Sequence, residues 1–171
     1  MQKNKYEKIG DCLKLARSQT IGNLPDLSIK VYQNKMNLYK TKKGKIAGTS
    51  FSEVCKDARR IYNLVRARTK RTPYVRSKYF RGEKIFITLF WSHLFEKSDR
   101  DRVRRLRYFE CALDLIRNSA VDPESRENFK QRNEILHRFN GITDKQEKFV
   151  VQIKENKRSK RKDLISIYPL D

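Results

Sequence analysis

The sequence predicts an α+β fold, in which N-terminal helices are followed by a small antiparallel β-sheet, a C-terminal three-strand meander packed against a basic helix. Apolar residues recur at helical spacing behind two capping motifs, and three short apolar segments with turn-like spacers follow near the C-terminus. Apolar residues make up 37% of the 171 residues and aromatic residues 11%, which is enough for one ordinary core. We therefore expect one domain with an N-terminal addition.

A helix is predicted to begin after Ser50. Ser50 and Glu53 form a capping box, in which the hydroxyl accepts a hydrogen bond from the backbone N–H of Glu53 while the carboxylate reaches back to Ser50. The Thr72-Pro73 pair is expected to end this helix. Its apolar stripe consists of Phe51, Val54, Ala58, Ile61, Leu64 and Val65.

Two less regular segments precede this helix. Residues 4–19 carry apolar side chains at helical intervals and predict a short amphipathic helix, whereas residues 27–46 alternate as a strand or an ordered arm would. Together with the capped helix they form a basic helical and extended region over residues 1–73. Residues 74–171 are expected to form the main domain.

The first part of this domain leads to a histidine. The segment Tyr74–Phe80 is extended and basic, and a turn follows at Arg81-Gly82-Glu83. Lys84–Trp91 is rich in β-branched and aromatic residues, which predicts either a buried strand or the entry to a buried helix. His93 lies just beyond it.

A long basic helix is predicted after Ser98, which forms a second capping motif with Asp101. Arginines crowd its first turns, where the positive end of the helix dipole disfavours cations. This mismatch indicates a nearby anion, with a solvated basic face as the alternative. The apolar stripe of this helix consists of Val103, Leu106, Phe109, Leu113, Ile116 and Ala120.

Three apolar segments then predict an antiparallel meander, Ile135–Phe139, Phe149–Ile153 and Leu164–Tyr168. Strand alternation would direct Ile165 and Ile167 toward the basic helix. The other face of the last strand would then carry Leu164, Ser166 and Tyr168.

The charge of the chain points to a polyanionic partner. Lys and Arg number 41 against 20 Asp and Glu, so the formal net charge is +21. Such a surface favours nucleic acid, RNA more than DNA, over the alternatives of a solubilising charge or a membrane surface. The cations expected to bind phosphate are Arg100, Arg102, Arg104, Arg107, Arg138, Lys157, Arg158, Lys160 and Arg161.

Several classes of protein are disfavoured. No apolar run is long enough to span a bilayer and the N-terminus has no signal-peptide core, so a cytoplasmic location is predicted. The three cysteines are widely spaced and suit reduced thiols. The sequence has no phosphate-binding loop and no dinucleotide motif, and its two histidines lack metal-ligand spacing. We expect no cofactor and no metal.

The remaining residues suit a metal-free ribonuclease, which needs a proton-transfer group, cations for the phosphorane charge and the 2′-hydroxyl of RNA as nucleophile. The candidates are His93, Arg104 or Arg105, Arg138, Ser166 and Tyr168. Each also has a structural interpretation: a histidine caps turns, and a tyrosine near a chain end packs. His137 alternates with apolar residues and fits a partly buried strand position.

The order of these elements, closing on Ile165-Ser166-Ile167-Tyr168-Pro169, resembles the barnase, EndoU, colicin E5/D and RelE-like (BECR) ribonuclease toxins, in particular their phage-associated branch. The resemblance covers about residues 74 to 171 and implies a compact sheet with helices on one face and a metal-independent cut of RNA. It implies catalytic roles for His93, Arg105, Ser166 and Tyr168. Two features depart from the family: Ser166 stands where threonine is common, and a second histidine near His93 is missing.

These departures keep alternative functions open. A non-catalytic RNA- or DNA-binding accessory protein of a mobile element, or a structural RNA protein, would carry the same charge. An active toxin would additionally require an antitoxin or immunity protein, which should be acidic to match +21. The alternatives differ in whether His93, an arginine and Ser166 or Tyr168 converge on one concave face.

Overall fold

The computed structural model describes residues 37–170 and confirms the α+β class. The helix predicted at residues 4–19 and the first half of the extended segment predicted at residues 27–46 lie outside the described residues, whereas the second half contains β1. The elements in chain order are β1 (Leu38–Lys40), α1 (Phe51–Ala67), β2 (Tyr74–Arg76), β3 (Lys84–Phe86), α2 (Thr88–Phe95), α3 (Asp99–Leu106), α4 (Phe109–Asn118), β4 (Glu124–Glu127), β5 (Glu134–Ile142), β6 (Lys148–Asn156) and β7 (Lys162–Pro169).

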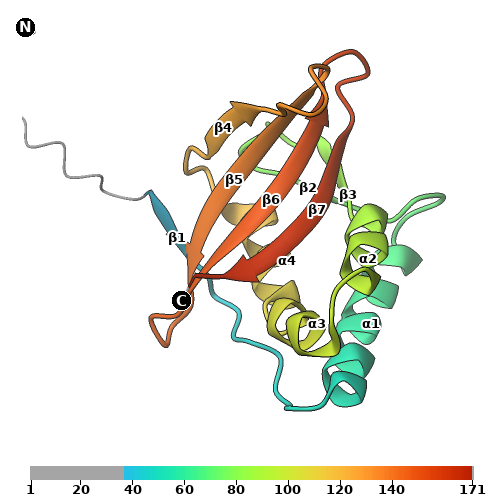
Figure 1. The fold of residues 1–171 in the computed structure, drawn as a ribbon, viewed down its shortest axis with the longest axis vertical. Coiled ribbons are helices and arrows are strands. Elements are labelled where there is room, and N and C mark those ends of the chain that lie inside the picture. The colour runs from blue at the N-terminus through green and yellow to red at the C-terminus, as the bar shows by residue number, and fades with distance from the viewer. Residues whose placement is uncertain (1–36, 171) are drawn as a thin grey trace, which may run out of the picture. The chain divides into compact units, whose positions relative to one another are not determined.

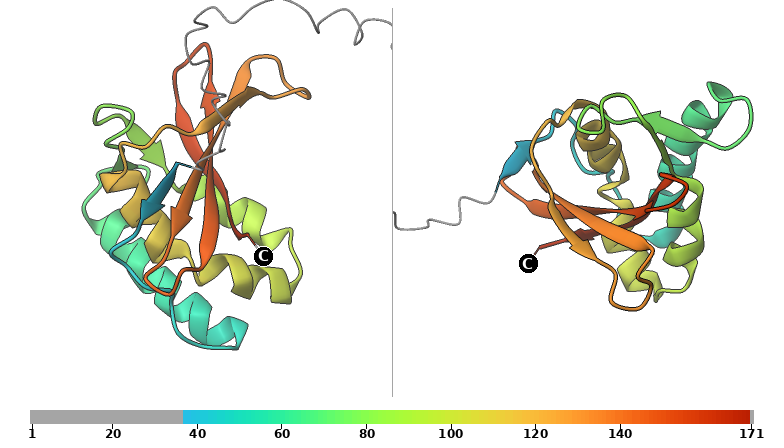
Figure 2. Two further views of the ribbon diagram at one scale, coloured as in Figure 1. Left: turned by 90° about the vertical axis from the view of Figure 1, so that its left-hand side faces the viewer. Right: turned by 90° about the horizontal axis from the view of Figure 1, so that it is seen from above.

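The strands form one seven-stranded sheet with the order β1-β5-β6-β7-β3-β2, and β4 also pairs with β5 (Figure 1). The first half of β5 pairs with β4 and its end pairs with β1, so both short strands share one edge of β5. Figure 2 shows that the sheet is strongly twisted, and its left view shows the helices gathered around the lower part of the sheet. Contacts group residues 36–171 into one compact unit.

The predicted meander is confirmed, because β5, β6 and β7 pair antiparallel in sequence order. The predicted orientation of β7 is wrong in part. Gln152 pairs with Ser166 and Ile153 pairs with Leu164, so Ile165 is an extra residue in a β-bulge. The extra residue breaks the alternation, so that Leu164 and Ile167, both fully buried, face the core. Ile165 is only partly buried and does not join them.

The single basic helix predicted after Ser98 is two helices, α3 and α4. The chain turns at Arg107 and Tyr108, where the Arg107 carbonyl accepts a hydrogen bond of 2.8 Å from the backbone N–H of Ile46. Tyr108 is buried and its ring stacks on Phe149 at 5.2 Å between centroids. The sequence did not predict this break, because apolar residues continue at helical spacing on both sides of it.

The predicted N-terminal cap of α1 is confirmed in its main bond. The backbone N–H of Glu53 donates to the Ser50 hydroxyl at 3.3 Å. The Glu53 carboxylate accepts from the N–H of Thr49 at 3.4 Å, one residue earlier than predicted. The helix ends at Ala67, well before Pro73.

The segment between Lys84 and Trp91 combines both alternatives that its composition allowed. β3 ends at Phe86 and α2 starts at Thr88, so His93 lies inside a helix of its own rather than just past a strand. Phe90 and Leu94 of α2 are fully buried in the core. This burial fixes the rotation of the helix.

The core lies between α4 and one face of the meander. Leu113 and Leu115 of α4 are fully buried, as are Phe149 and Val151 of β6. Gly141 of β5 is required by this packing: a Cβ at that position would lie 2.4 Å from Phe149 and 2.9 Å from Leu115. The odd-numbered residues of β5 thus face α4, and by strand alternation the even-numbered ones face the opposite side.

A buried carboxylate, which the sequence did not single out, fastens the chain after β1 to α4. Asp114 accepts hydrogen bonds of 2.9 Å from the Thr41 hydroxyl and from the Lys42 backbone N–H. Burial alone would raise its pKa, but these bonds and one from Asn118 outweigh burial and hold the pKa below the ordinary value.

Candidate active site

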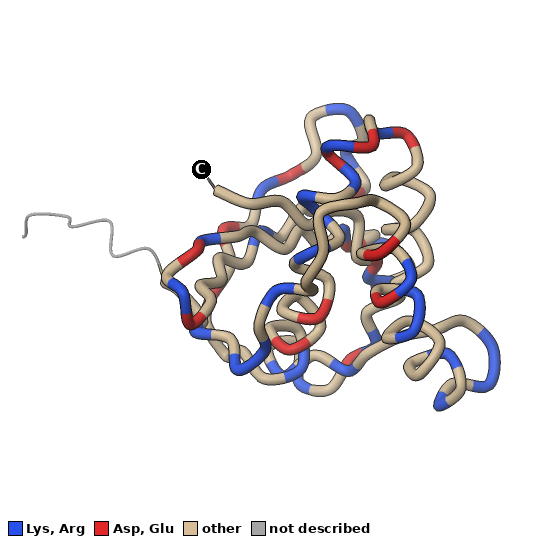
Figure 3. The backbone as a smooth tube through the Cα atoms, turned by 90° about the horizontal axis from the view of Figure 1, so that it is seen from below, with Lys and Arg blue, Asp and Glu red and all other residues tan. Residues whose placement is uncertain are grey.

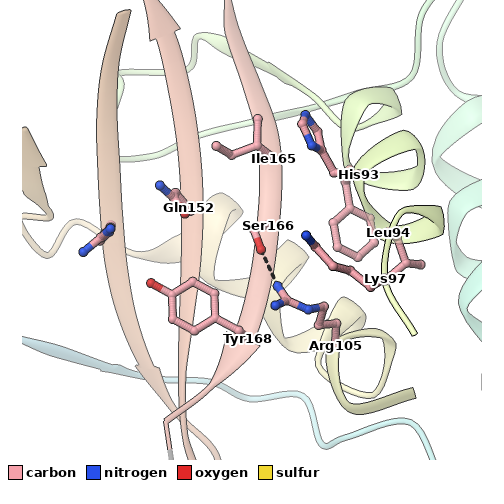
Figure 4. A pocket seen from close by; sticks show the side chains of 10 residues that line it. His93, Leu94, Lys97, Arg105, Gln152, Ile165, Ser166 and Tyr168 are labelled. Carbon is pink, nitrogen blue, oxygen red and sulfur yellow. Dashed lines mark hydrogen bonds between the residues drawn. The ribbon is translucent and has the colours of Figure 1, made fainter. Parts of the chain in front are cut away.

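A pocket of about 420 Å³ opens between α2, α3 and the face of the meander that points away from α4. Side chains from the helices project toward β7 across this pocket (Figure 4). The four predicted catalytic residues all line it, although they come from three separate elements. The lining consists of Phe90, His93, Leu94, Lys97, Arg105, Arg138, Gln152, Ile165, Ser166 and Tyr168.

One face of α2 supplies the wall that carries His93. Four residues at helical spacing share this face of α2 and the turn that follows it: Phe90, His93, Leu94 and Lys97. The two apolar members are buried and anchor this face. The His93 side chain remains 44% exposed, and its Nδ1 lies 3.6 Å from the Glu96 carboxylate. The imidazole is therefore accessible from the pocket.

The meander supplies the opposite wall. Arg138, Gln152 and Ser166 form one row of paired residues across β5, β6 and β7. Tyr168 follows two residues after Ser166 on the same face. The bulge at Ile165 sets this register, so it determines which hydroxyl groups the strand presents to the pocket.

Arg105 links the two walls. Its Nη1 donates to the Ser166 hydroxyl at 2.6 Å and lies 3.4 Å from the backbone carbonyl of Ile167. The guanidinium carbon lies 5.9 Å from the centre of the Tyr168 ring. Leu106, next in the chain, is fully buried and anchors the end of α3. The position of the guanidinium is therefore fixed from both sides.

The pocket is cationic. Lys97, Arg105 and Arg138 line it, and none of the ten lining residues that the structure describes is Asp or Glu. The Glu96 carboxylate, which lies 3.6 Å from His93, is at an exposed position. Positive groups without an internal counter-charge in a concave site favour an anionic ligand.

Lys and Arg are spread over helices, strands and loops of the described chain (Figure 3). Of the predicted phosphate-binding cations, Arg138 lines the pocket itself, and Arg104 and Arg107 line a neighbouring hollow of about 220 Å³. Arg100, Arg158 and Lys160 are exposed to solvent.

The remaining cations of that prediction are engaged within the fold. Arg102 donates to Asp99 at 2.8 Å, and Arg161 forms a two-pronged ion pair with Asp163. Lys157 pairs with a carboxylate of β4. Contact of these three side chains with phosphate would have to compete with their internal partners.

The second histidine, His137, lies on the opposite face of β5 from Arg138. Its Nδ1 is 2.8 Å from the Ser125 hydroxyl and its Nε2 is 3.1 Å from the Glu155 carboxylate. The side chain is 9% exposed, and burial lowers its pKa although Glu155 opposes this shift. These contacts agree with the partly buried strand position that the sequence indicated.

Two residues of the pocket were missed by the sequence analysis. Lys97 follows His93 by one helical turn, but this spacing had no meaning without the knowledge that α2 is a helix. Gln152 is a polar residue inside the apolar segment of β6. Its place in the pocket follows from its pairing with Ser166, which the sequence did not reveal.

Residues 37–170 hold no group of three or more His, Cys, Asp and Glu side chains placed to bind a metal ion. Over the same range, no helix is long and apolar enough to cross a membrane. Comparison of the chain with family models, curated proteins and solved structures found no match. The resemblance to the BECR ribonucleases therefore stays a prediction.

Proposed function

We propose that the protein is a metal-independent endoribonuclease of toxin type, which cleaves RNA through attack of the 2′-hydroxyl on the adjacent phosphate. One observation carries the proposal: His93, Arg105, Ser166 and Tyr168, chosen from distant parts of the sequence, line one cationic pocket. A protein that only binds RNA does not need an accessible imidazole beside a guanidinium and two hydroxyls.

In the proposed reaction, His93 takes the proton of the 2′-hydroxyl. Histidine suits this role because its ordinary titration range allows proton exchange near neutral pH. The 2′-oxygen then bonds to phosphorus and the bond from phosphorus to the 5′-oxygen breaks. The leaving 5′-oxygen receives a proton from Tyr168 or from solvent, and the products carry a 2′,3′-cyclic phosphate and a 5′-hydroxyl.

Arg105 and Ser166 would act on the phosphate as a pair. The Ser166 oxygen accepts a hydrogen bond from Arg105, which leaves its own O–H free to donate to a phosphate oxygen. The remaining guanidinium donors of Arg105 can neutralise the charge that grows on the equatorial oxygens. Tyr168 lies near the guanidinium and could alternatively stack on a base.

The toxin assignment has consequences for the cell. An active ribonuclease acting in the cytoplasm would require an acidic antitoxin or immunity protein, and the cationic pocket is the surface that such a protein would cover. The wild-type protein, expressed without such a partner, is then expected to arrest growth, whereas Arg105→Ala is not.

The test is to incubate the pure protein with total RNA in excess EDTA. We expect discrete fragments ending in a 2′,3′-cyclic phosphate, no cleavage of DNA of the same sequence, and no cleavage where a single 2′-deoxy nucleotide replaces the cut nucleotide. Intact RNA under every condition, with binding preserved, would overturn the proposal and leave the non-catalytic accessory protein in its place.

A further inference from the structure

An exposed aromatic ring stands at the turn between β4 and β5. Phe129 is 98% exposed, whereas phenylalanine is among the residues most often buried. It lines a second hollow of about 250 Å³, whose apolar floor includes Leu136. The Phe129 ring thus offers a flat apolar surface, and the hollow is a cavity beside it.

The turn that carries Phe129 is held in place by several hydrogen bonds. The backbone N–H of Asn128 donates to the Glu134 carbonyl at 2.9 Å, and the Asn128 side chain donates to the Glu134 carboxylate at 2.9 Å. Glu134 is itself buried and forms a 2.9 Å ion pair with Lys154. The exposed position of the ring is thus set by the turn around it.

The hollow adjoins the candidate active site through a shared residue. Arg138 lines both cavities, and Leu136 lies two residues before it on the same face of β5. Arg138 and Ser166 are separated by two strand spacings along one row of the sheet, about 10 Å. A single strand of nucleic acid could therefore extend from one cavity to the other.

The charge around the hollow is complementary to a polynucleotide. Arg126, Lys130 and Arg138 line it together with the carboxylate of Glu127, and Arg126 also lies 3.6 Å from the Glu124 carboxylate. Glu127 accepts a hydrogen bond of 2.5 Å from Lys157, so this carboxylate is neutralised locally. The lining thus combines an aromatic face for a base with cations for the backbone.

We propose that this hollow is a second subsite for the RNA substrate, in which one nucleobase stacks on Phe129 while the strand continues over Arg138 into the candidate active site. This inference rests on the proposed ribonuclease function and specifies its substrate class. A base must be unpaired to stack on a protein side chain, so the substrate is single-stranded RNA or an unpaired loop.

The experiment measures binding and cleavage separately. Binding is followed by fluorescence anisotropy with a labelled 2′-O-methyl oligouridine of about ten nucleotides, which cannot be cut by 2′-hydroxyl attack. Phe129→Ala and Phe129→Leu are each expected to weaken Kd about tenfold, whereas Phe129→Trp should preserve it. The matched control is Leu64→Ala, because Leu64 is an exposed apolar residue on α1 and is 58% exposed.

Two further readouts identify the contact as stacking. The salt dependence of Kd should be the same for Phe129→Ala and the wild type, since no ionic contact is removed. An oligomer with an abasic site at the stacked position should bind the wild type more weakly and should make the Phe129→Ala substitution silent.

The outcomes separate this inference from the proposed function. Wild-type Kd and KM for Phe129→Ala, with RNA still cleaved, would overturn the subsite while the ribonuclease stands, and would point to Phe129 as a contact for a protein instead. A loss of affinity without any cleavage by the wild type would support the subsite and overturn the ribonuclease. Absence of RNA binding by the wild type would overturn both.

Discussion

The two histidines lie on opposite sides of the meander, and their surroundings differ in almost every respect. His137 points to the side that α4 covers, and both of its ring nitrogens have partners within 3.1 Å. His93 points into the open pocket, and its nearest carboxylate is 3.6 Å away. The ring nitrogens of His137 have partners within the fold, whereas the His93 ring faces an open cationic pocket.

This difference shows why residue type alone did not identify the site. Both histidines are polar residues in apolar stretches of the sequence, and either could transfer protons. His93, unlike His137, lines a pocket together with Lys97 and Arg138. Neither of these two cations has a carboxylate partner among the contacts of the described residues. If stability depends on the buried core and chemistry on the open face, substitutions in the two regions will have different effects.

The largest effect is expected from the buried core, in stability. Leu106→Ala and Leu113→Ala should each lower the free energy of unfolding by about 2 to 5 kcal/mol, because both side chains are fully buried and would leave cavities. Urea denaturation measures this change. Leu64→Ala, the exposed control, should change it by less than about 0.5 kcal/mol, and equal effects at all three positions would contradict the burial of Leu106 and Leu113.

On the open face, Arg105→Ala should reduce the cleavage rate about 100-fold or more, with a much smaller change in RNA affinity. Arg105→Lys should also lose most of the activity, because lysine cannot keep the fixed planar donor set that meets Ser166. Arg100→Ala is the matched control, since Arg100 lies exposed on the same helix. A control that loses as much activity as Arg105→Ala would show that the helix acts through charge alone.

The exposed cations should affect binding through salt. Removing Arg100, Arg158 and Lys160 together should lower the slope of log Kobs against log salt by about 0.7 for each lost phosphate contact on single strands. The same experiment with Arg102 and Arg161 should change the slope less, because Asp99 and Asp163 already hold these side chains. An unchanged slope in the triple variant would place the nucleic-acid face elsewhere.

The smallest effect concerns pH and the covered histidine. Burial lowers the folded-state pKa of His137, so the unfolded chain binds this proton more strongly. The resulting stability is fully present above the unfolded value of about 6.5 and is lost as the pH falls through the folded value. Thermal denaturation between neutral and mildly acidic pH should therefore show a steeper loss for the wild type than for His137→Gln, and parallel curves would contradict this.

The sequence predicted the elements whose signal is local. The cap at Ser50 and the three strands of the meander follow from side chains within a few residues of one another, and both are confirmed. The break at Tyr108 and the bulge at Ile165 were missed, because each depends on packing with residues distant in the chain. The exposed turn at Phe129 carried no signal because a lone phenylalanine in a polar stretch has no period.

The candidate site was predictable only as a set of residue types. Chemistry left Arg104 and Arg105 as alternatives beside His93, and the family resemblance narrowed the candidates to four. The pocket brings these four residues together. Lys97 and Gln152 joined the set only when a helix face and a strand register were known, since neither residue stands out by type. Asp114 was invisible for the same reason, although it holds the chain after β1 through three donors from residues 39 to 42.

The most direct test compares the two histidines in a single cleavage assay. Labelled RNA is incubated in EDTA with the wild type, His93→Ala and His137→Gln, after melting curves have shown that all three are folded at the assay temperature. We expect His93→Ala to cleave at least about 100-fold more slowly than the wild type while binding RNA with similar affinity, and His137→Gln to cleave at nearly the wild-type rate. Full activity of His93→Ala, or loss of activity in His137→Gln alone, would contradict the assignment of chemistry to the open face.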